Sequence, residues 1–221
     1  MPVLDRHDKV FVLHLGDGEN RFHPDWVAAV QSALDEVEGT PGPRALVTTA
    51  TGKFFSNGLD LDWLDAHADQ QRDHIVSVQQ LFARVLTQPL VTVAALQGHA
   101  FGAGAILALA HDFRVMRADR GYWCLPEADI AVPFTPGIAA LVQARLAPRV
   151  AHEAMIVARR FGGTDAAEAE IVDSAVAGDL IQAAALDLAA SHASKAGETL
   201  ATIKARMYAE VLTALRNGTA H

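Results

Sequence analysis

Hydrophobic residues recur along the first half of the chain with two alternating periods, one typical of strands and the other of helices. Short apolar, β-branched runs at residues 9–15, 44–50 and 90–96 predict buried strands. Between these runs, apolar residues spaced by three and four positions predict helices, the first opening at Pro24 and the second closing before Pro89. Because strands and helices alternate, we expect parallel strands joined by helical crossovers.

The second half of the chain is mostly helical in pattern. The run "AILALA" is apolar on every face, which predicts a buried helix, and the short runs "DFRVM" and "GYWCL" predict two strands. Beyond Pro136, Gly, Pro or Thr-Asp signals separate four helical segments: "IAALVQARLA", "RVAHEAMIVARR", "LIQAAALDLAASHASKA" and "ETLATIKARMYAEVLTALR". We therefore expect one α/β domain over residues 1–221, with a core to about residue 160 and a helical part over about 161–221.

Composition narrows the class of protein. With 221 residues, 51% of them hydrophobic and 20% charged, the chain can bury a sizeable core as an ordinary globular protein. Its apolar runs fall short of the roughly 20 residues of a spanning helix, and its start does not resemble a secretion signal. A single cysteine, Cys124, fits a reducing compartment, so we expect a cytoplasmic protein. The formal charge of −8 opposes nucleic-acid binding, and the ten histidines show no metal-binding spacing.

Two glycine-rich turns carry candidate chemistry. "SNGLDL" and "GHAFGAGA" both follow predicted buried strands and lead towards helices. Such turns expose backbone N–H groups that, aimed at one oxygen, form an oxyanion hole. Tight turns and close helix packing explain the same glycines, and spacing alone does not separate the two interpretations. The glycines do not follow the order G-x-G-x-x-G, so the pattern gives no support for a nicotinamide cofactor.

A third stretch, "CLPEADIAVPFTPG", places Glu127 among apolar neighbours. Apolar surroundings raise the pKa of a carboxyl towards the range that is useful for proton transfer. The alternative is an ordinary solvated acid in a turn.

These stretches, taken together, resemble the crotonase superfamily, the enoyl-CoA hydratase and isomerase group. The matching pieces occur in order between about Val10 and Val172: "ENRF", "FFSNGLDL", "VAALQGHAFGAGAILALAHDFRV", "LPEADIAVPFTPG" and "RRFGGTDAAEAEIVD". The resemblance implies an α/β crotonase-like spiral of strand-strand-helix turns with a helical C-terminal region. It also implies an acyl-CoA thioester as the substrate and a homotrimer or dimer of trimers as the assembly.

The resemblance also assigns site residues. It implies that the N–H groups of Leu59 and Ala103 hold the thioester oxygen and that Glu127 is catalytic. The other positions expected to contact substrate are Ser56, Asn57, Gly58, Phe101, Gly102 and Phe134. Hydratases of the family use two glutamates, and Ile106 stands at the first of these positions. A single base beside an oxyanion hole suffices for a proton shuttle, so we expect a Δ3,Δ2-enoyl-CoA isomerase that needs no metal or redox cofactor.

Several alternatives stay open. A hydratase, thioesterase or decarboxylase would keep the two amides, and a noncatalytic crotonase-fold module would keep only the fold. Lys204 and Arg206 either contact CoA phosphates, as basic residues late in the chain do in relatives, or lie on a solvated helix face. Trp63 and Trp123 either line an acyl pocket or pack in the core. Glu170 stands where relatives commonly have glycine, which predicts strain at a helix C-terminus.

Overall fold

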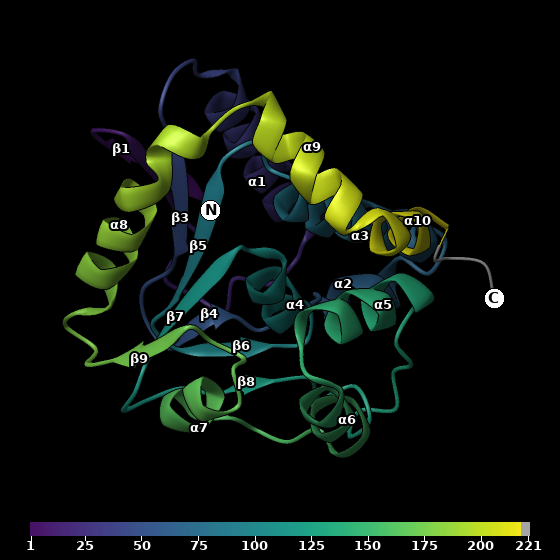
Figure 1. The fold of residues 1–221 in the computed structure, drawn as a ribbon. Helices are drawn as coiled ribbons and strands as arrows, with labels where there is room; N and C mark the ends of the chain where they lie inside the picture. The colour runs from purple at the N-terminus through teal and green to yellow at the C-terminus, as the bar shows by residue number, and fades with distance from the viewer. Residues whose placement is uncertain (218–221) are drawn as a thin grey trace.

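In the computed structural model, which describes residues 1–217, the strands form a main sheet and a smaller second sheet (Figure 1). The main sheet has the order β1 (Val3–His7), β2 (Val10–His14), β3 (Ala45–Thr49), β5 (Val91–Leu96), β7 (Phe113–Arg117) and β9 (Ser174–Val176). The small sheet has the order β4 (Phe54–Ser56), β6 (His99–Phe101) and β8 (Trp123–Cys124). Apart from the antiparallel pair β1 and β2, all these strands pair in parallel, as the alternation of strands and helices predicts.

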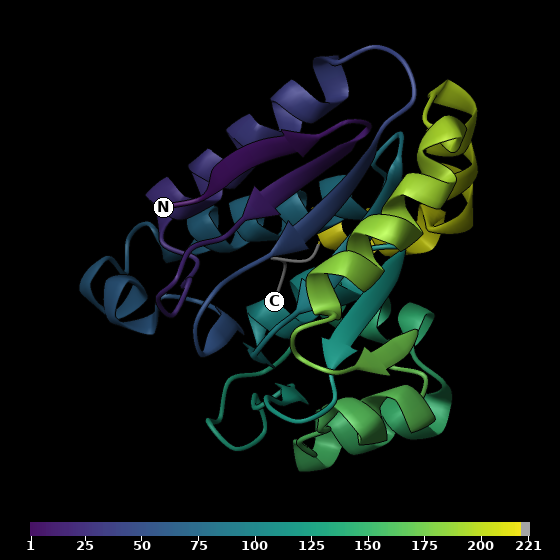
Figure 2. The same cartoon turned by 90° about the vertical axis from the view of Figure 1, so that its left-hand side faces the viewer.

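Helices cover both faces of the main sheet. The first half contributes α1 (Pro24–Gly39), α2 (Leu61–Ala66), α3 (Gln71–Leu86) and α4 (Ala103–Ala110). The second half contributes α5 (Pro136–Arg145), α6 (Pro148–Val157), α7 (Gly163–Glu168), α8 (Ile181–His192), α9 (Glu198–Met207) and α10 (Ala209–Asn217). Figure 2 shows α8 lying across one face of the main sheet, with α1 and α3 behind it.

The central strands β2, β3 and β5 are mostly apolar because both of their faces are buried. Val10 and Val12 pack in the cluster under α8, whereas Phe11 and Leu13 point to the larger core under α1 and α3. A strand covered on both sides needs apolar residues at every position. The predicted strands at 9–15, 44–50 and 90–96 are confirmed as β2, β3 and β5.

The all-apolar helix is also confirmed. In α4 every residue from Gly104 to Ala110 is buried. The helix lies inside the molecule between the two sheets and α3 and α5 (Figure 1). Its burial fixes the position of its first turn, which carries one of the candidate amides.

Other elements differ from the prediction. β4, β6 and β9 have three residues each, too few to show a period. The strands predicted at "DFRVM" and "GYWCL" are confirmed as β7 and β8. The last predicted helix is two helices, α9 and α10, separated at Tyr208. Within residues 161–217, the mostly helical C-terminal part also contains β9, which joins the main sheet, and α8, which covers that sheet. Within residues 1–217, no helix combines the length and the apolar character required to cross a bilayer.

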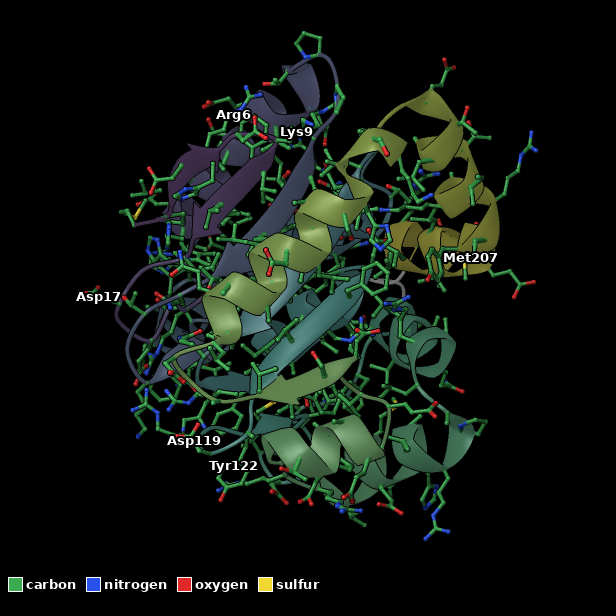
Figure 3. The ribbon with its side chains drawn as sticks, turned by 60° about the vertical axis from the view of Figure 1, so that its left-hand side comes forward. Arg6, Lys9, Asp17, Asp119, Tyr122 and Met207 are labelled. Carbon is green, nitrogen blue, oxygen red and sulfur yellow. The ribbon has the colours of Figure 1, made fainter. Side chains whose placement is uncertain are left out.

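In α9 two apolar side chains face solvent and a lysine faces the core, the reverse of the usual distribution of these residue types. Met207 is 71% exposed and projects from the surface (Figure 3), and Ile203 is 55% exposed, while Lys204 is only 5% exposed. The Lys204 Nζ donates to the Leu90 carbonyl at 2.8 Å and to Asp112 Oδ2 at 2.6 Å. Burial lowers the pKa of Lys204, and the adjacent Asp112 carboxylate opposes that shift. Both sequence interpretations of Lys204, a phosphate contact and a solvated face, are therefore wrong.

We predict that Lys204→Met destabilises the protein by about 3 kcal/mol, because it leaves the carboxylate of Asp112 without its cation in a mostly buried place. The Asp112 side chain keeps 22% exposure, which places the cost at the low end for a broken buried pair. Urea unfolding measures the change. The matched control is Arg206→Met on the exposed face of the same helix, which should change stability by no more than about 0.5 kcal/mol. Equal effects of the two changes would contradict the structural role of Lys204.

Candidate active site

Three chain segments meet where the strands of the small sheet end. β4, β6 and β8 run parallel, so their carboxyl ends lie at one edge. The turn at Gly58, the turn at Gly102 and the segment containing Glu127 follow these three strands directly. Ligand sites of parallel sheets commonly lie beyond the carboxyl ends of strands, where successive loops converge.

The first turn is fixed by a buried serine. Ser56 is fully buried, and its Oγ donates to the Asn20 carbonyl at 2.7 Å and accepts from the Gly58 N–H at 3.2 Å. Gly58 has φ 84°, a left-handed conformation that favours glycine. The backbone then presents Leu59, whose N–H makes no backbone hydrogen bond within the described chain.

The second turn begins α4. Gly102 has φ 50°, and its N–H donates to the Cys124 carbonyl at 3.1 Å, which ties the turn to β8. Ala103 is the first residue of the helix, so its N–H has no carbonyl one turn earlier to bond. The aligned peptide dipoles of α4 add partial positive charge at this end. An anion or a polarised oxygen is favoured here.

The two turns are in direct contact because glycines leave out side chains. A Cβ placed on Gly58 would lie 2.8 Å from the Phe101 carbonyl oxygen and 3.1 Å from the Ala103 nitrogen. A Cβ on Gly104 would lie 2.5 Å from the Ser56 carbonyl oxygen. The glycines therefore do serve close packing, and that packing brings the amide-bearing turns together.

Glu127 lies beside the second turn. A Cβ on Gly102 would sit 3.4 Å from Glu127 Oε1, so the carboxylate lies within van der Waals reach of this turn. The other carboxylate oxygen, Oε2, is buried and has no hydrogen-bond partner among the described residues. Burial raises the pKa of Glu127 to about 7, against a smaller opposite effect of a backbone hydrogen bond. The carboxyl is thus suited to accept and release a proton near neutral pH.

Ile106 lies in α4, one turn after Gly102. It is 1% exposed and belongs to the main core. The position therefore offers no polar group to a water molecule.

The sequence as a whole matches a known family. The family model described as enoyl-CoA hydratase/isomerase matches residues 5–220. The chain belongs to this family. The enoyl-CoA delta isomerase 2, peroxisomal, of Arabidopsis thaliana is 37% identical to it over 225 residues, covering 96% of this chain and 93% of that protein. The enoyl-CoA delta isomerase 3 of the same plant is 38% identical over 223 residues, with coverage of 96% and 93%.

Solved structures agree on the fold. An enoyl-CoA hydratase/isomerase family protein from Pseudomonas syringae matches with a TM-score of 0.90 at 26% identity, covering 98% of this chain and 94% of that one. The apo enoyl-CoA isomerase of Mycobacterium tuberculosis matches with a TM-score of 0.88 at 27% identity, covering 98% and 95%. The expected crotonase-like α/β fold is confirmed.

Within this family framework, some predicted substrate contacts lie elsewhere. Ser56 has no exposed surface and its hydroxyl is engaged in the turn, so it holds the turn and has no free surface for a substrate. Phe101 is half-buried and its ring packs against Phe54 and His99, and its contact with substrate stays a prediction. His99 accepts from the Tyr122 N–H at 3.2 Å, so its ring has a structural role at the start of β6.

Other predicted residues keep an open role. Asn57 is half-buried and its N–H donates to the Glu19 carbonyl at 2.8 Å. Phe134 is half-buried against the main core, and Trp63 is half-buried and stacked on His67. The two tryptophans differ, because Trp123 is fully buried and is a core residue.

The other predictions from the resemblance concern charge and strain. Arg206 is exposed, so its contact with CoA phosphates stays a prediction, whereas Lys204 is not available for such a contact. Glu170 does adopt a left-handed backbone, with φ 57°, at the end of α7, as its replacement of glycine predicts. Within residues 1–217, no three His, Cys, Asp or Glu side chains gather in a way that could hold a metal ion.

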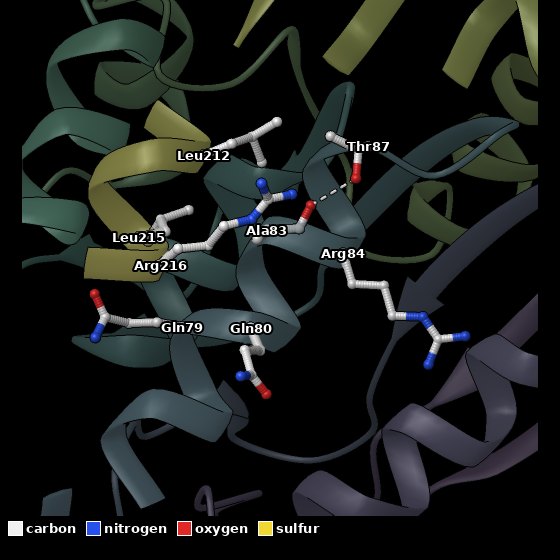
Figure 4. Close-up of a pocket in the computed structure, with 8 residues that line it drawn as sticks. All are labelled: Gln79, Gln80, Ala83, Arg84, Thr87, Leu212, Leu215 and Arg216. Atoms are coloured by element: carbon white, nitrogen blue, oxygen red, sulfur yellow. Dashed lines mark hydrogen bonds between the residues drawn. The ribbon is translucent and has the colours of Figure 1, made fainter. Parts of the chain in front are cut away.

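A surface pocket lies apart from the turns, between α3 and α10 (Figure 4). Its lining residues are Gln79, Gln80, Ala83, Arg84, Thr87, Leu212, Leu215 and Arg216. Arg84 is turned away from it in Figure 4 and pairs with Asp35 and Glu38. The pocket therefore shares no residue with the oxyanion turns or with Glu127.

We predict that Gly58→Ala destabilises the protein by about 1–3 kcal/mol, because a Cβ at this left-handed position overlaps the second turn. Urea unfolding measures the change. Gly18→Ala is the control, since no atom lies within 4 Å of its added Cβ; we expect an effect below about 0.5 kcal/mol. A Gly58 variant as stable as the Gly18 variant would show that the two turns do not depend on this contact.

Proposed function

We propose that this protein is a Δ3,Δ2-enoyl-CoA isomerase, which moves the double bond of a 3-enoyl-CoA next to the thioester. The observation that carries the proposal is one buried carboxyl, Glu127, beside two adjoining turns whose amides are free, with apolar Ile106 on the neighbouring helix. The names of the two Arabidopsis relatives support the same reaction class.

The two amides stabilise the negative charge of the reaction. Removal of a proton beside a thioester places charge on the carbonyl oxygen and gives a dienolate. The N–H groups of Leu59 and Ala103 receive that oxygen, and the dipole of α4 adds to their effect. Fixed donors of this kind contribute about 3–4 kcal/mol each to transition-state stabilisation.

Glu127 carries the proton between two carbons. Its carboxylate takes a proton from C2 of the 3-enoyl thioester, and the electron pair moves into the dienolate. The protonated Glu127 then returns the proton to C4, which leaves the double bond between C2 and C3. No atom is gained or lost, so the reaction needs neither water nor a redox partner.

The rival reading within the family is a hydratase. Hydration requires a polar group that orients water in addition to the base, and the resemblance places Ile106 where a hydratase has that glutamate. A buried isoleucine accepts no hydrogen bond and donates none. A noncatalytic module would have no use for a carboxyl with a pKa near 7 beside free amides.

We predict that the protein converts trans-3-hexenoyl-CoA to trans-2-hexenoyl-CoA and that Glu127→Gln lowers the rate by at least about 100-fold, because the amide cannot accept the proton. Asp129→Asn, which alters an exposed carboxyl two residues away, is the control and should keep the wild-type rate. A coupled assay that follows the formation of the 2-enoyl product by absorbance measures the rates of both variants. Hydration of trans-2-hexenoyl-CoA at a rate similar to isomerisation would contradict the proposal, and so would a fully active Glu127→Gln.

We predict that kcat/KM for isomerisation rises with pH and reaches half of its plateau near pH 7, where burial places the pKa of Glu127. The direction follows from the role of the group: the base must be deprotonated, so activity is lost as pH falls. At pH 6 the rate should be about one-tenth of the plateau, from the ionised fraction of a single group. A midpoint near the ordinary value of a glutamate would show that Glu127 is solvated in the free enzyme, contrary to the structure.

A further inference from the structure

We propose that Asn20 is a positioning residue that holds the first oxyanion turn from behind, together with its neighbours in the segment 19–22. The segment precedes α1 and has no part in the reaction above. Its catalytic consequence rests on the proposed function, whereas its effect on the turn does not.

The side chain of Asn20 spans two successive carbonyls of β4. Its Nδ2 donates to the Phe54 carbonyl at 3.1 Å and to the Phe55 carbonyl at 3.0 Å. Its own backbone carbonyl accepts from Ser56 Oγ at 2.7 Å. Asn20 has φ 51°, a left-handed conformation that asparagine tolerates better than most residues. One residue thus makes contacts with three consecutive residues before the turn.

The neighbours of Asn20 continue the same pattern. The Asn57 N–H donates to the Glu19 carbonyl at 2.8 Å, and the Phe22 N–H donates to the Gly58 carbonyl at 2.8 Å. Every residue from 54 to 58 therefore has a hydrogen bond to the segment 19–22. Leu59, which carries the amide, comes next in the chain.

The segment is itself firmly anchored. Phe22 is fully buried, its ring packs against Trp26, and its carbonyl is bonded to His74 Nε2 at 2.7 Å. A Cβ on Gly16 would lie 2.6 Å from Asn20 Oδ1, so the carboxamide occupies a closely fitted place. An anchored segment can impose its geometry on the turn.

The small sheet alone does not define that geometry. β4 has three residues, and its pairing with β6 shifts register between Phe54 and Ser56. At this irregularity the strand loses regular ladder bonds, and the carboxamide of Asn20 supplies bonds from the opposite side. The orientation of the Leu59 amide therefore depends on this second set of bonds. Its loss would matter for the reaction, because misplacing a reacting group by about 1 Å can cost about 100-fold in rate.

The chain offers a matched control for testing Asn20. Gln97 Nε2 also donates to the Phe54 carbonyl, at 2.8 Å, but its other bond goes to the Thr51 carbonyl, ahead of β4. Gln97→Ala therefore loosens the same carbonyl without touching the turn. Asn20→Gly removes the carboxamide and tolerates the left-handed φ, and Asn20→Asp keeps the size of the side chain but loses both N–H donors.

Hydrogen–deuterium exchange of the free protein tests the contact directly. We expect faster amide exchange in residues 56–59 of Asn20→Gly and Asn20→Asp and unchanged exchange there in Gln97→Ala. Unchanged exchange in both Asn20 variants would overturn the proposal. A rise of equal size in β2, β3 and β5 would also overturn it, since it would show a general loss of stability.

Kinetics on trans-3-hexenoyl-CoA test the consequence. In the Asn20 variants we expect kcat to fall by about tenfold or more while KM stays within about threefold, because the amide acts mainly on the charged transition state. The midpoint of the pH profile should not move, since Glu127 is untouched. Full kcat in both Asn20 variants would overturn the positioning role. If the wild-type protein turns over no 3-enoyl-CoA while the Asn20 variants still show faster exchange in residues 56–59, the proposed function is contradicted and the contact is supported.

Discussion

The structure depends on the contact between the turn at Gly58 and the N-terminus of α4. Two polypeptide backbones approach there at a distance that excludes any Cβ on Gly58 or Gly104. Such contact needs rigid support on both sides, because backbone amides cannot be repositioned by rotating a side chain. One side is supported by the burial of α4 on every face, and the other by the bonds from residues 19–22. The site thus takes its geometry from the core and not from flexible loops.

The same apolar surroundings serve stability and chemistry. α4 is buried on every face, and Glu127 beside its first turn is also partly withdrawn from water, which raises the pKa of its carboxyl. Dry surroundings strengthen the interaction of an enolate oxygen with the amides of Leu59 and Ala103. Ile106 belongs to this apolar environment as well. Under the proposed function, its apolar side chain favours proton transfer between carbons over the addition of water, and the choice of reaction would follow from packing.

Much of the fold follows from periodicity because the main sheet is covered on both faces and α4 is apolar all round. The same reasoning could not find β4 and β6, since strands of three residues have no period, although together with β8, which lies within the predicted strand "GYWCL", they create the edge at which the turns and Glu127 meet. It reached the turns through their glycines and the resemblance to a family. Lys204 shows where pattern reasoning fails: α9 turns a lysine inward and Met207 outward, and only the partner Asp112, far away in sequence, explains this orientation.

The C-terminal helices contribute to the site from a distance. Glu127 lies on a connection between β8 and α5, and the far end of that connection needs a fixed position. Thr135 caps α5 by accepting from the Ile138 N–H, and its hydroxyl lies 3.0 Å from Gln79 Oε1. α10 packs closely on the first turn of α5, where a Cβ on Gly137 would lie 2.6 Å from the Leu215 Cα. The buried ion pair of Lys204 and Asp112 anchors α9, which packs on α10, and α10 packs on α5, so these contacts help to fix the far end of the segment that carries Glu127.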